Sequence, residues 1–253
     1  MFRFYVSSEN IHENFVELEK EDINHVKNVL RMKAGEHILV CDMQGVDYEC
    51  ILSEITDACV RADIKCSMKN EAELPADIML FQGMPKKDKM ELIIQKAVEL
   101  GATRIVPVMT RYCVTKLDSK KEEKVISRWN TIARSAAKQS QRGIIPQVTP
   151  VMKFADAVKE ASKCDLAVVA YEKAKGMEYS KKILGDVKGK KNIAVFIGPE
   201  GGFSEEEINA AFESGVTAVS LGHRILRTET AGLTILSIIM FGLEEDKEGG
   251  QEA

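Results

Sequence analysis

The sequence predicts an α/β protein in two parts: a small β-barrel with one helix, then an open parallel sheet covered by helices on both faces. Short, partly alternating apolar runs fill the first 70 residues, which is typical of strands. A polar stretch containing Pro75 follows, and after it continuous apolar runs alternate with amphipathic helical segments. We therefore expect domains at 1–72 and 73–245, with a disordered acidic tail at 246–253.

The first part contains three strand-like runs and one helix-like run. Gln44-Gly45 separates the first two strand-like runs and predicts a hairpin turn. The helix-like run has apolar residues on one face and ends at Gly35. The predicted strands are HILVCDM (37–43), DYECILSEI (47–55) and VRADIKCSM (60–68), and the predicted helix is DINHVKNVLRMKAG (22–35).

In the second part, strand-like and helix-like segments alternate. This alternation predicts a parallel sheet that binds its ligand at the carboxyl ends of the strands. The last helix is apolar nearly all round, so it must be buried in the core or against a second subunit. The predicted strands are 77–84, 102–109, 165–172, 192–198 and 217–222; the predicted helices are 86–101, 126–143, 204–215 and 230–245, with a short lysine-rich helix before the strand at 192–198.

The charges are segregated along the chain although the net charge of the 253 residues is only −4. Between Met84 and Arg142 there are 14 Lys/Arg against 6 Asp/Glu, whereas from Gly198 onward there are 3 against 11. Residues 1–70 carry 8 basic and 13 acidic residues. This distribution indicates a polyanion-binding face in the middle of the chain, although solvated helix faces also account for it.

Several classes of protein are disfavoured. The sequence contains no run of 18 apolar residues, so it predicts no membrane span. The first residues, MFRFYVSSEN, lack the apolar stretch of a signal peptide, and we therefore expect a cytoplasmic protein. The six cysteines form no C-x-x-C pair and have no histidine at zinc spacing, which predicts reduced thiols and no metal site.

The stretch IGPEGGFSEEE (197–207) predicts a ligand-binding turn at the end of a buried strand. Its glycines let the backbone approach a ligand, and Ser204 with Glu207 forms a capping box that starts a helix. No P-loop or dinucleotide motif is present, and the turn carries four carboxylates with no lysine nearby in the sequence. A neutral or cationic ligand with hydroxyl groups fits better than a triphosphate, and the alternative is a glycine turn with a good helix cap.

The stretch SLGHRILRTETAGL (220–233) holds apolar residues between two arginines, which is typical of a loop around an aromatic ligand. Thr228 or Thr230 can cap the last helix, with Glu229 near its positive end. Arg227 is the cation best placed for an RNA phosphate or a substrate base, and the alternative is an ion pair with Glu229 or Glu200.

The stretch ARSAAKQSQRG (133–143) places Arg134, Lys138 and Arg142 at helical spacing. Long cations on one helix face suit contacts with the phosphates of RNA, and a solvated face is the alternative.

Together, GPEGG, LGHRILRTETA and AAKQSQR resemble the SPOUT-class ribosomal RNA methyltransferases that methylate uracil N3 in 16S rRNA. INHVKNVLRMKAGE (23–36) resembles their N-terminal PUA-like barrel, and QKAVELGATRIVPVMTRY (95–112) resembles the first helix and strand of their methyltransferase domain. The resemblance implies a deep trefoil knot, an S-adenosylmethionine cofactor and a homodimer that acts on the small ribosomal subunit.

The resemblance also implies the residues of the site. Three loops would hold the cofactor, and basic side chains of both parts would contact RNA. The implied cofactor-binding residues are Ala170, Tyr171, Glu172, Gly198, Pro199, Glu200, Gly201, Gly202, Leu221, Gly222, Ile225, Leu226, Arg227, Thr228 and Thr230. The expected RNA-binding residues are Arg3, Lys27, Arg31, Lys33, Arg134, Lys138 and Arg142.

The reaction that the resemblance implies removes a weakly acidic proton from uracil N3. Arg227, and Arg142 from either the same or the partner subunit, are candidates to stabilise the uracil anion and a flanking phosphate. Glu229 is the candidate base or the group that orients Arg227. N3 lies on the pairing edge, so the target base must be unpaired or flipped out. The alternatives are a non-catalytic RNA-binding factor for ribosome assembly on the same fold and a nucleotide-dependent oxidoreductase, which the missing dinucleotide motif disfavours.

Overall fold

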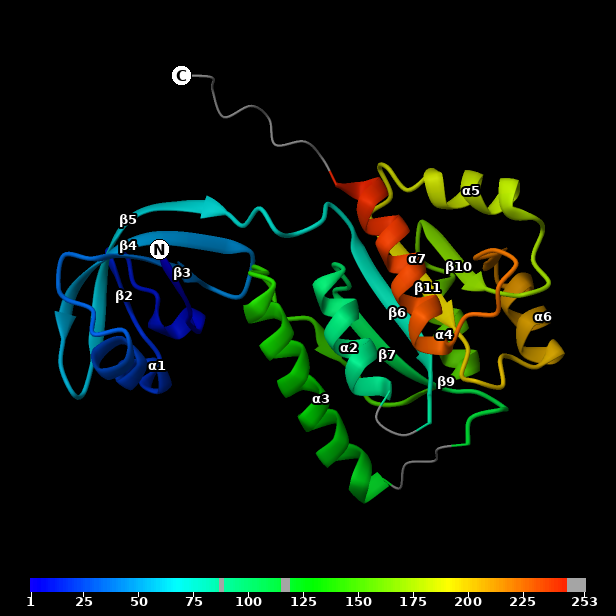
Figure 1. Ribbon diagram of the computed structural model, residues 1–253, viewed down its shortest axis with the longest axis horizontal. Helices are drawn as coiled ribbons and strands as arrows, with labels where there is room; N and C mark the ends of the chain where they lie inside the picture. Colours follow the sequence, from blue (N-terminus) through cyan, green and yellow to red (C-terminus); the bar gives the residue numbers. More distant parts are fainter. Residues whose placement is uncertain (87–88, 115–118, 245–253) are drawn as a thin grey trace. The chain divides into compact units, whose positions relative to one another are not determined.

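Figure 1 shows the computed structural model, which describes residues 1–86, 89–114 and 119–244. The predicted acidic tail at 246–253 lies outside these residues. No helix among the described residues is long and apolar enough to span a membrane.

The chain divides into two compact units. The first combines residues 1–73 with residues 137–145, and the second begins at Leu74 and continues again from Pro146. The segment 137–145 is therefore part of the first unit, whereas the sequence predicted it within the second domain.

The first unit is built on a five-stranded sheet in the order β1-β3-β4-β5-β2. β1 runs parallel to β3, and the other neighbours are antiparallel. Alternate apolar side chains of these strands, among them Val16, Ile38 and Leu52, form its core. The strands are β1 (Phe2–Tyr5), β2 (Phe15–Glu17), β3 (His37–Cys41), β4 (Val46–Ile55) and β5 (Val60–Lys69).

The turn predicted at Gln44-Gly45 joins β3 to β4, and Gly45 has a positive φ of 100° that favours glycine. The helix predicted over 22–35 is shorter: α1 (Lys20–Asn24) continues as a π-helical segment, η2 (His25–Val29). Arg31, with φ of 54°, ends the helical path four residues before Gly35. A short 3₁₀ helix, η1 (Ser8–Asn10), follows β1.

The second unit contains a parallel sheet in the order β12-β10-β11-β6-β7-β8, with β9 paired to β7, and this confirms the predicted α/β class. The strands are β6 (Asp77–Gly83), β7 (Arg104–Met109), β8 (Gln147–Val148), β9 (Met152–Lys153), β10 (Leu166–Ala170), β11 (Asn192–Ile197) and β12 (Thr217–Val219). The helices are α2 (Lys89–Glu99), α3 (Ser119–Gln139), α4 (Phe154–Ala161), α5 (Met177–Gly185), α6 (Glu205–Glu213) and α7 (Thr228–Leu243).

Helices cover both faces of this sheet. Phe81 and Phe196 stack at a centroid distance of 4.6 Å and pack with α4 and α6. Their strand neighbours Gln82 and Ile197 face Gly232 of α7. Successive residues of a strand point to opposite faces, so α7 lies across the sheet from α4 and α6 (Figure 1). The trefoil knot that the resemblance implies stays a prediction.

Candidate active site

The glycine-rich turn follows β11 at the carboxyl edge of the sheet, where open α/β sheets bind ligands. The predicted capping box is present: Ser204 accepts the backbone N–H of Glu207, and the Glu207 carboxylate accepts the N–H of Ser204 at 2.9 Å. α6 therefore begins where the sequence predicted, and its first turn lies next to the turn 198–202.

Two glycines allow the chain to pass very close to this turn. A Cβ at Gly83, the last residue of β6, would lie 2.5 Å from Cδ of Pro199. A Cβ at Gly201 would lie 2.8 Å from Cβ of Tyr112 in the loop after β7. Real Cβ atoms do not approach so closely, so both positions require glycine unless the backbone moves.

The first residue of α7 bonds to this turn through its side chain. The buried Thr228 hydroxyl donates to the Gly198 carbonyl at 2.6 Å and accepts from Nε2 of Gln82 at 2.9 Å. Arg227 is the N-cap residue, and no side chain caps this helix. The prediction that Thr228 or Thr230 caps α7 is therefore wrong, because Thr228 lies inside the first turn and its hydroxyl is directed to the neighbouring loop.

Lys89, at the start of α2, joins the two acidic residues of the predicted site. Its Nζ lies 3.1 Å from Oε1 of Glu200 and 3.2 Å from Oε2 of Glu229. These contacts raise the pKa of Lys89 above its ordinary value. Burial alone raises the pKa of Glu200, but hydrogen bonds from backbone N–H groups and the contact with Lys89 outweigh it, so this pKa is lowered. Lys89 and Glu200 are therefore charged at neutral pH.

The other carboxylates of the turn also have cationic or hydrogen-bonding partners. Glu206 lies 3.2 Å from Nη1 of Arg111, whose backbone N–H donates to Glu207 at 2.8 Å. Glu205 lies 3.8 Å from Nζ of Lys173. The expectation that no lysine offsets these acids is wrong, because Lys89 and Lys173 are distant in sequence but close in the fold.

Most of the remaining predicted cofactor-binding residues lie at the end of β10 or in the loops after β10 and β12, at the same edge of the sheet, and Thr230 lies in the first turn of α7. The backbone N–H of Tyr171 donates to the Val219 carbonyl at 3.0 Å, which brings the loop after β10 to the end of β12. Gly222 has a φ of 111°, a conformation that favours glycine. Ile225 is 87% exposed. Glu172 and Thr230 are also exposed, whereas Ala170, Leu221 and Leu226 are half-buried.

Arg227 is exposed and forms no ion pair with another residue of the described segments. The acids that the sequence offered as its partners, Glu200 and Glu229, instead contact Lys89. The guanidinium of Arg227 is therefore available to a ligand at the start of α7.

Arg142 lies in the first unit and not on the predicted helix face. α3 ends at Gln139, and Gln141 adopts a φ of 58°, so the spacing of Arg134, Lys138 and Arg142 is not helical throughout. Arg142 is 2% exposed, and its Nη2 lies 2.6 Å from Oε2 of Glu73. The prediction of an exposed three-residue basic stripe is wrong, and the surroundings of Arg142 favour a structural role.

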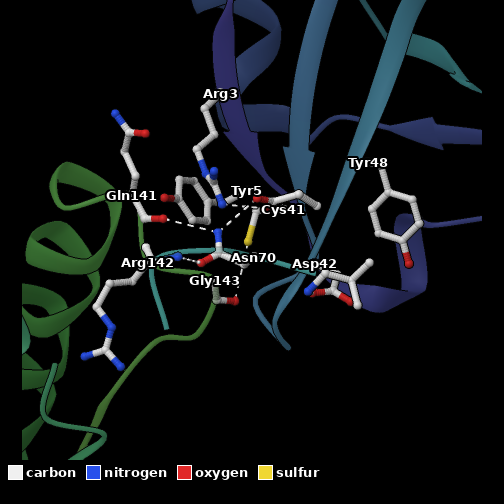
Figure 2. A network of polar contacts seen from close by, with 12 residues as sticks. Arg3, Tyr5, Cys41, Asp42, Tyr48, Asn70, Gln141, Arg142 and Gly143 are labelled. Atoms are coloured by element: carbon white, nitrogen blue, oxygen red, sulfur yellow. Dashed lines mark hydrogen bonds and ion pairs between the residues drawn. The ribbon is translucent and has the colours of Figure 1, made fainter. Parts of the chain in front are cut away.

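The segment around Arg142 is held by a network of polar contacts (Figure 2). Nδ2 of Asn70 donates to the Gln141 carbonyl at 3.3 Å and to Asp47 at 2.9 Å. The Cys41 thiol donates to the Gly143 carbonyl at 3.4 Å. These contacts explain why residues 137–145 belong to the first unit.

The other residues predicted to bind RNA differ in how available they are. Arg31, Lys33 and Arg134 are exposed. Arg3 and Lys27 form ion pairs with Asp47 and Asp57. Nζ of Lys138 lies 5.4 Å from the ring centroid of Tyr5.

Sequence reasoning missed Lys89, Gln82 and Gly83 in this site. Lys89 occurs in a lysine-rich run that resembles an ordinary solvated helix start. Gln82 is a buried polar residue inside an otherwise apolar strand. A polar residue in such a strand can be recognised in the sequence and indicates a candidate site.

Comparison with known proteins extends this description. A family model described as an RNA methyltransferase domain matches residues 72–240, and one described as an RNA methyltransferase PUA domain matches residues 18–59. Ribosomal RNA small subunit methyltransferase E of Bacillus subtilis (strain 168) is 37% identical to this chain over 88% of it and 89% of the relative. The protein of the same name in Mesomycoplasma hyopneumoniae (strain 232) is 32% identical, over 94% of this chain and 98% of the relative.

Solved structures are similar over nearly the whole chain. The crystal structure of a ribosomal RNA small subunit methyltransferase E from Neisseria gonorrhoeae bound to S-adenosyl methionine superposes with a TM-score of 0.79. It is 33% identical and covers 95% of this chain and 97% of its own.

Proposed function

We propose that this chain, which belongs to the RNA methyltransferase family, transfers a methyl group from S-adenosylmethionine to N3 of a uridine in 16S rRNA of the small ribosomal subunit. The observation that carries this proposal is the joining of the turn 198–202 to the start of α7 by Thr228 and Lys89, beside the exposed Arg227. We also propose that the reaction takes place in the cytoplasm.

The turn 198–202 has the features that an adenosine-containing cofactor requires. Gly198, Gly201 and Gly202 present backbone without Cβ atoms, and Gly201 has no space for one beside Tyr112. Glu200 supplies a carboxylate that can accept hydrogen bonds from ribose hydroxyls while it contacts Lys89. The half-buried Leu221 and Leu226 provide apolar surface for the base. The bound cofactor supplies an electrophilic methyl group on a positively charged sulfur.

Methylation at N3 replaces the N3–H proton by a methyl group, so the site must favour loss of that proton. The guanidinium of Arg227 would donate hydrogen bonds to the uracil oxygens and stabilise the developing anion. Glu229 is the nearest candidate for the proton acceptor, but its contact with Lys89 favours the alternative role of fixing the start of α7. The expected role of Arg142 in stabilising the anion would require its buried ion pair with Glu73 to open.

RNA contact would use the exposed cations of both units. Arg31 and Lys33 in the first unit and Arg134 on α3 are exposed, and long cations of this kind bind backbone phosphates without reading sequence. The target uracil would have to leave any base pair to expose N3.

We also propose that the protein is a homodimer that associates through α7. Phe241 is 83% exposed and Ile238 is 41% exposed on this helix. They line an apolar hollow of about 260 Å³ together with Met177 and Leu184 of α5. A second copy would bury this surface, which is costly to leave in water.

The decisive experiment is mass mapping of 16S rRNA from a strain that lacks this gene, compared with the same strain complemented by wild-type or Arg227→Ala protein. We expect one methylated uridine to disappear on deletion, to return with the wild-type gene and to remain absent with Arg227→Ala. Full methylation by Arg227→Ala would refute the role of Arg227. Unchanged rRNA together with no calorimetric binding of S-adenosylmethionine would instead favour a non-catalytic assembly factor.

A further inference from the structure

The contact that Lys89 makes with Glu200 and Glu229 differs from an ordinary surface ion pair. Lys89 is the first residue of α2, Glu200 lies in the turn after β11, and Glu229 lies in the first turn of α7. One ammonium group therefore connects three segments that are far apart in the sequence. By contrast, the only ion-pair partner of Lys96 within the described part of the chain is Glu99, three positions further along the same helix.

The three charged groups are also partly withdrawn from water. The side chains of Lys89, Glu200 and Glu229 are 29%, 27% and 15% exposed. Both carboxylates approach the same nitrogen within 3.2 Å, so they are close neighbours of each other. Without the ammonium group, two negative charges would face each other at this position and attract the nearest available cation.

The nearest cation in the sequence is Arg227, two residues before Glu229. The bond from the Thr228 hydroxyl to the Gly198 carbonyl fixes the segment 227–229 beside the turn that carries Glu200. The ammonium group of Lys89 contacts the carboxylates of both Glu200 and Glu229, and Arg227 remains exposed.

Glu200 has a second contact with the segment that precedes α2. The backbone N–H of Lys86 lies 3.2 Å and 3.3 Å from the two carboxylate oxygens of Glu200. The turn 198–202 is thus attached to this segment by a backbone hydrogen bond as well as by Lys89. Loss of the Lys89 charge would therefore change the electrostatics of the site more than the path of the turn.

We propose that Lys89 is a positioning residue for methyl transfer: it binds Glu200 and Glu229 together and so keeps the guanidinium of Arg227 available to the substrate. This inference rests on the proposed function, since it assigns Lys89 a part in the same reaction. Lys89 acts through the two acids and through Arg227, not by contact with the reacting atoms.

The test compares Lys89→Met, Lys89→Arg and the matched control Lys96→Met with the wild-type protein. Four quantities are measured: kcat and KM for methyl transfer to small-subunit RNA, the Kd for S-adenosylmethionine by calorimetry, and Tm. For Lys89→Met we expect kcat to fall about tenfold or more, because displacement of a catalytic group by about 1 Å has effects of that size, with a smaller change in Kd. Lys89→Arg keeps the charge and should recover most of the activity, and Lys96→Met should match the wild type.

Two further measurements separate positioning from a general loss of structure. A crystal structure of Lys89→Met should show the guanidinium of Arg227 within ion-pair distance of Glu200 or Glu229. The double variant Lys89→Met/Glu229→Gln removes one of the two competing acids and relieves their repulsion. The ratio of kcat between Glu229→Gln and this double variant should be smaller than the ratio between the wild type and Lys89→Met.

The inference is overturned if Lys89→Met retains the wild-type kcat. It is also overturned if Arg227 stays unpaired in the variant structure, or if Tm, Kd and kcat all fall together and Lys89→Arg recovers none of them. If the wild-type protein itself fails to methylate small-subunit RNA, the proposed function is wrong, and the crystal structure of the variant still decides whether Lys89 keeps Arg227 from the acids.

Discussion

Replacement of Thr228 by valine tests whether its hydroxyl holds the start of α7 to the turn 198–202. Valine has almost the same shape as threonine, so the change removes polar contacts without leaving a cavity. The hydroxyl donates to the Gly198 carbonyl and accepts from Gln82 in a buried position. The variant therefore loses two hydrogen bonds and leaves buried polar groups without those partners.

The magnitude follows from these two bonds. Each is worth about 1 kcal/mol net, and an unsatisfied buried group costs about 1 kcal/mol more, so we expect a loss of about 3 kcal/mol in the free energy of unfolding of the second unit. For a domain of this size that loss corresponds to a decrease in Tm of roughly 6–12 °C. The affinity for S-adenosylmethionine should fall as well, because the two loops that Thr228 joins are the proposed cofactor loops.

Scanning calorimetry with and without S-adenosylmethionine measures both effects. Thr228→Ser retains the hydroxyl and should stay close to the wild type. Thr234→Val is the matched control on the same helix, since the Thr234 hydroxyl donates to the Thr230 carbonyl one turn earlier, in an exposed position. If Thr228→Val and Thr234→Val unfold at the same temperature as the wild-type protein, the reasoning about this contact is refuted.

Three other substitutions test the buried ion pair of Arg142, the close packing at Gly201 and the exposed apolar face of α7. Arg142→Met leaves the carboxylate of Glu73 without its buried cation, so the free energy of unfolding of the first unit, measured with urea, should fall by about 3 kcal/mol. An unchanged midpoint of urea unfolding together with weaker RNA binding would instead support an RNA-binding role for Arg142. Gly201→Ala places a methyl group against Tyr112 and should weaken S-adenosylmethionine binding about tenfold, since overpacking costs about 1–3 kcal/mol; wild-type affinity by calorimetry would contradict this. Phe241→Lys puts a charge on the exposed apolar face of α7 and should shift a dimer toward monomer in sedimentation velocity without lowering the stability of the monomer; a dimer that persists would place the interface elsewhere.

Local sequence patterns predicted most elements of the second unit, because their signals lie within a few residues, but missed β8, β9 and α4. The capping box of Ser204 and Glu207 spans one helical turn, and it forms as predicted. The continuous apolar run 192–198 became the buried strand β11. The two short strands β1 and β2 in the first unit were missed, because four and three residues give too little alternation to distinguish a strand from a loop.

The partners of the site residues could not be predicted, because they depend on which loops the sheet brings together. Lys89 and Glu200 are 111 positions apart, so the acidic turn seemed uncompensated in the sequence. Arg142 continues the helical spacing of Arg134, yet the left-handed conformation of Gln141 breaks the helix before it. Arg142 is therefore buried against Glu73 and does not share a helix face with Arg134.

The return of the chain to its first unit at residues 137–145 affects the order in which the protein can fold during synthesis. The side chains of Asn70 and Glu73 bond to Gln141, Arg142 and Gly143, so these bonds cannot form until the later segment has been made. The whole stretch from Leu74 to Ala136, which contains β6, α2, β7 and most of α3, must leave the ribosome before the first unit is complete. A fragment cut at residue 73 would lack these contacts, and an exchange of this unit between relatives would have to carry both pieces of the chain.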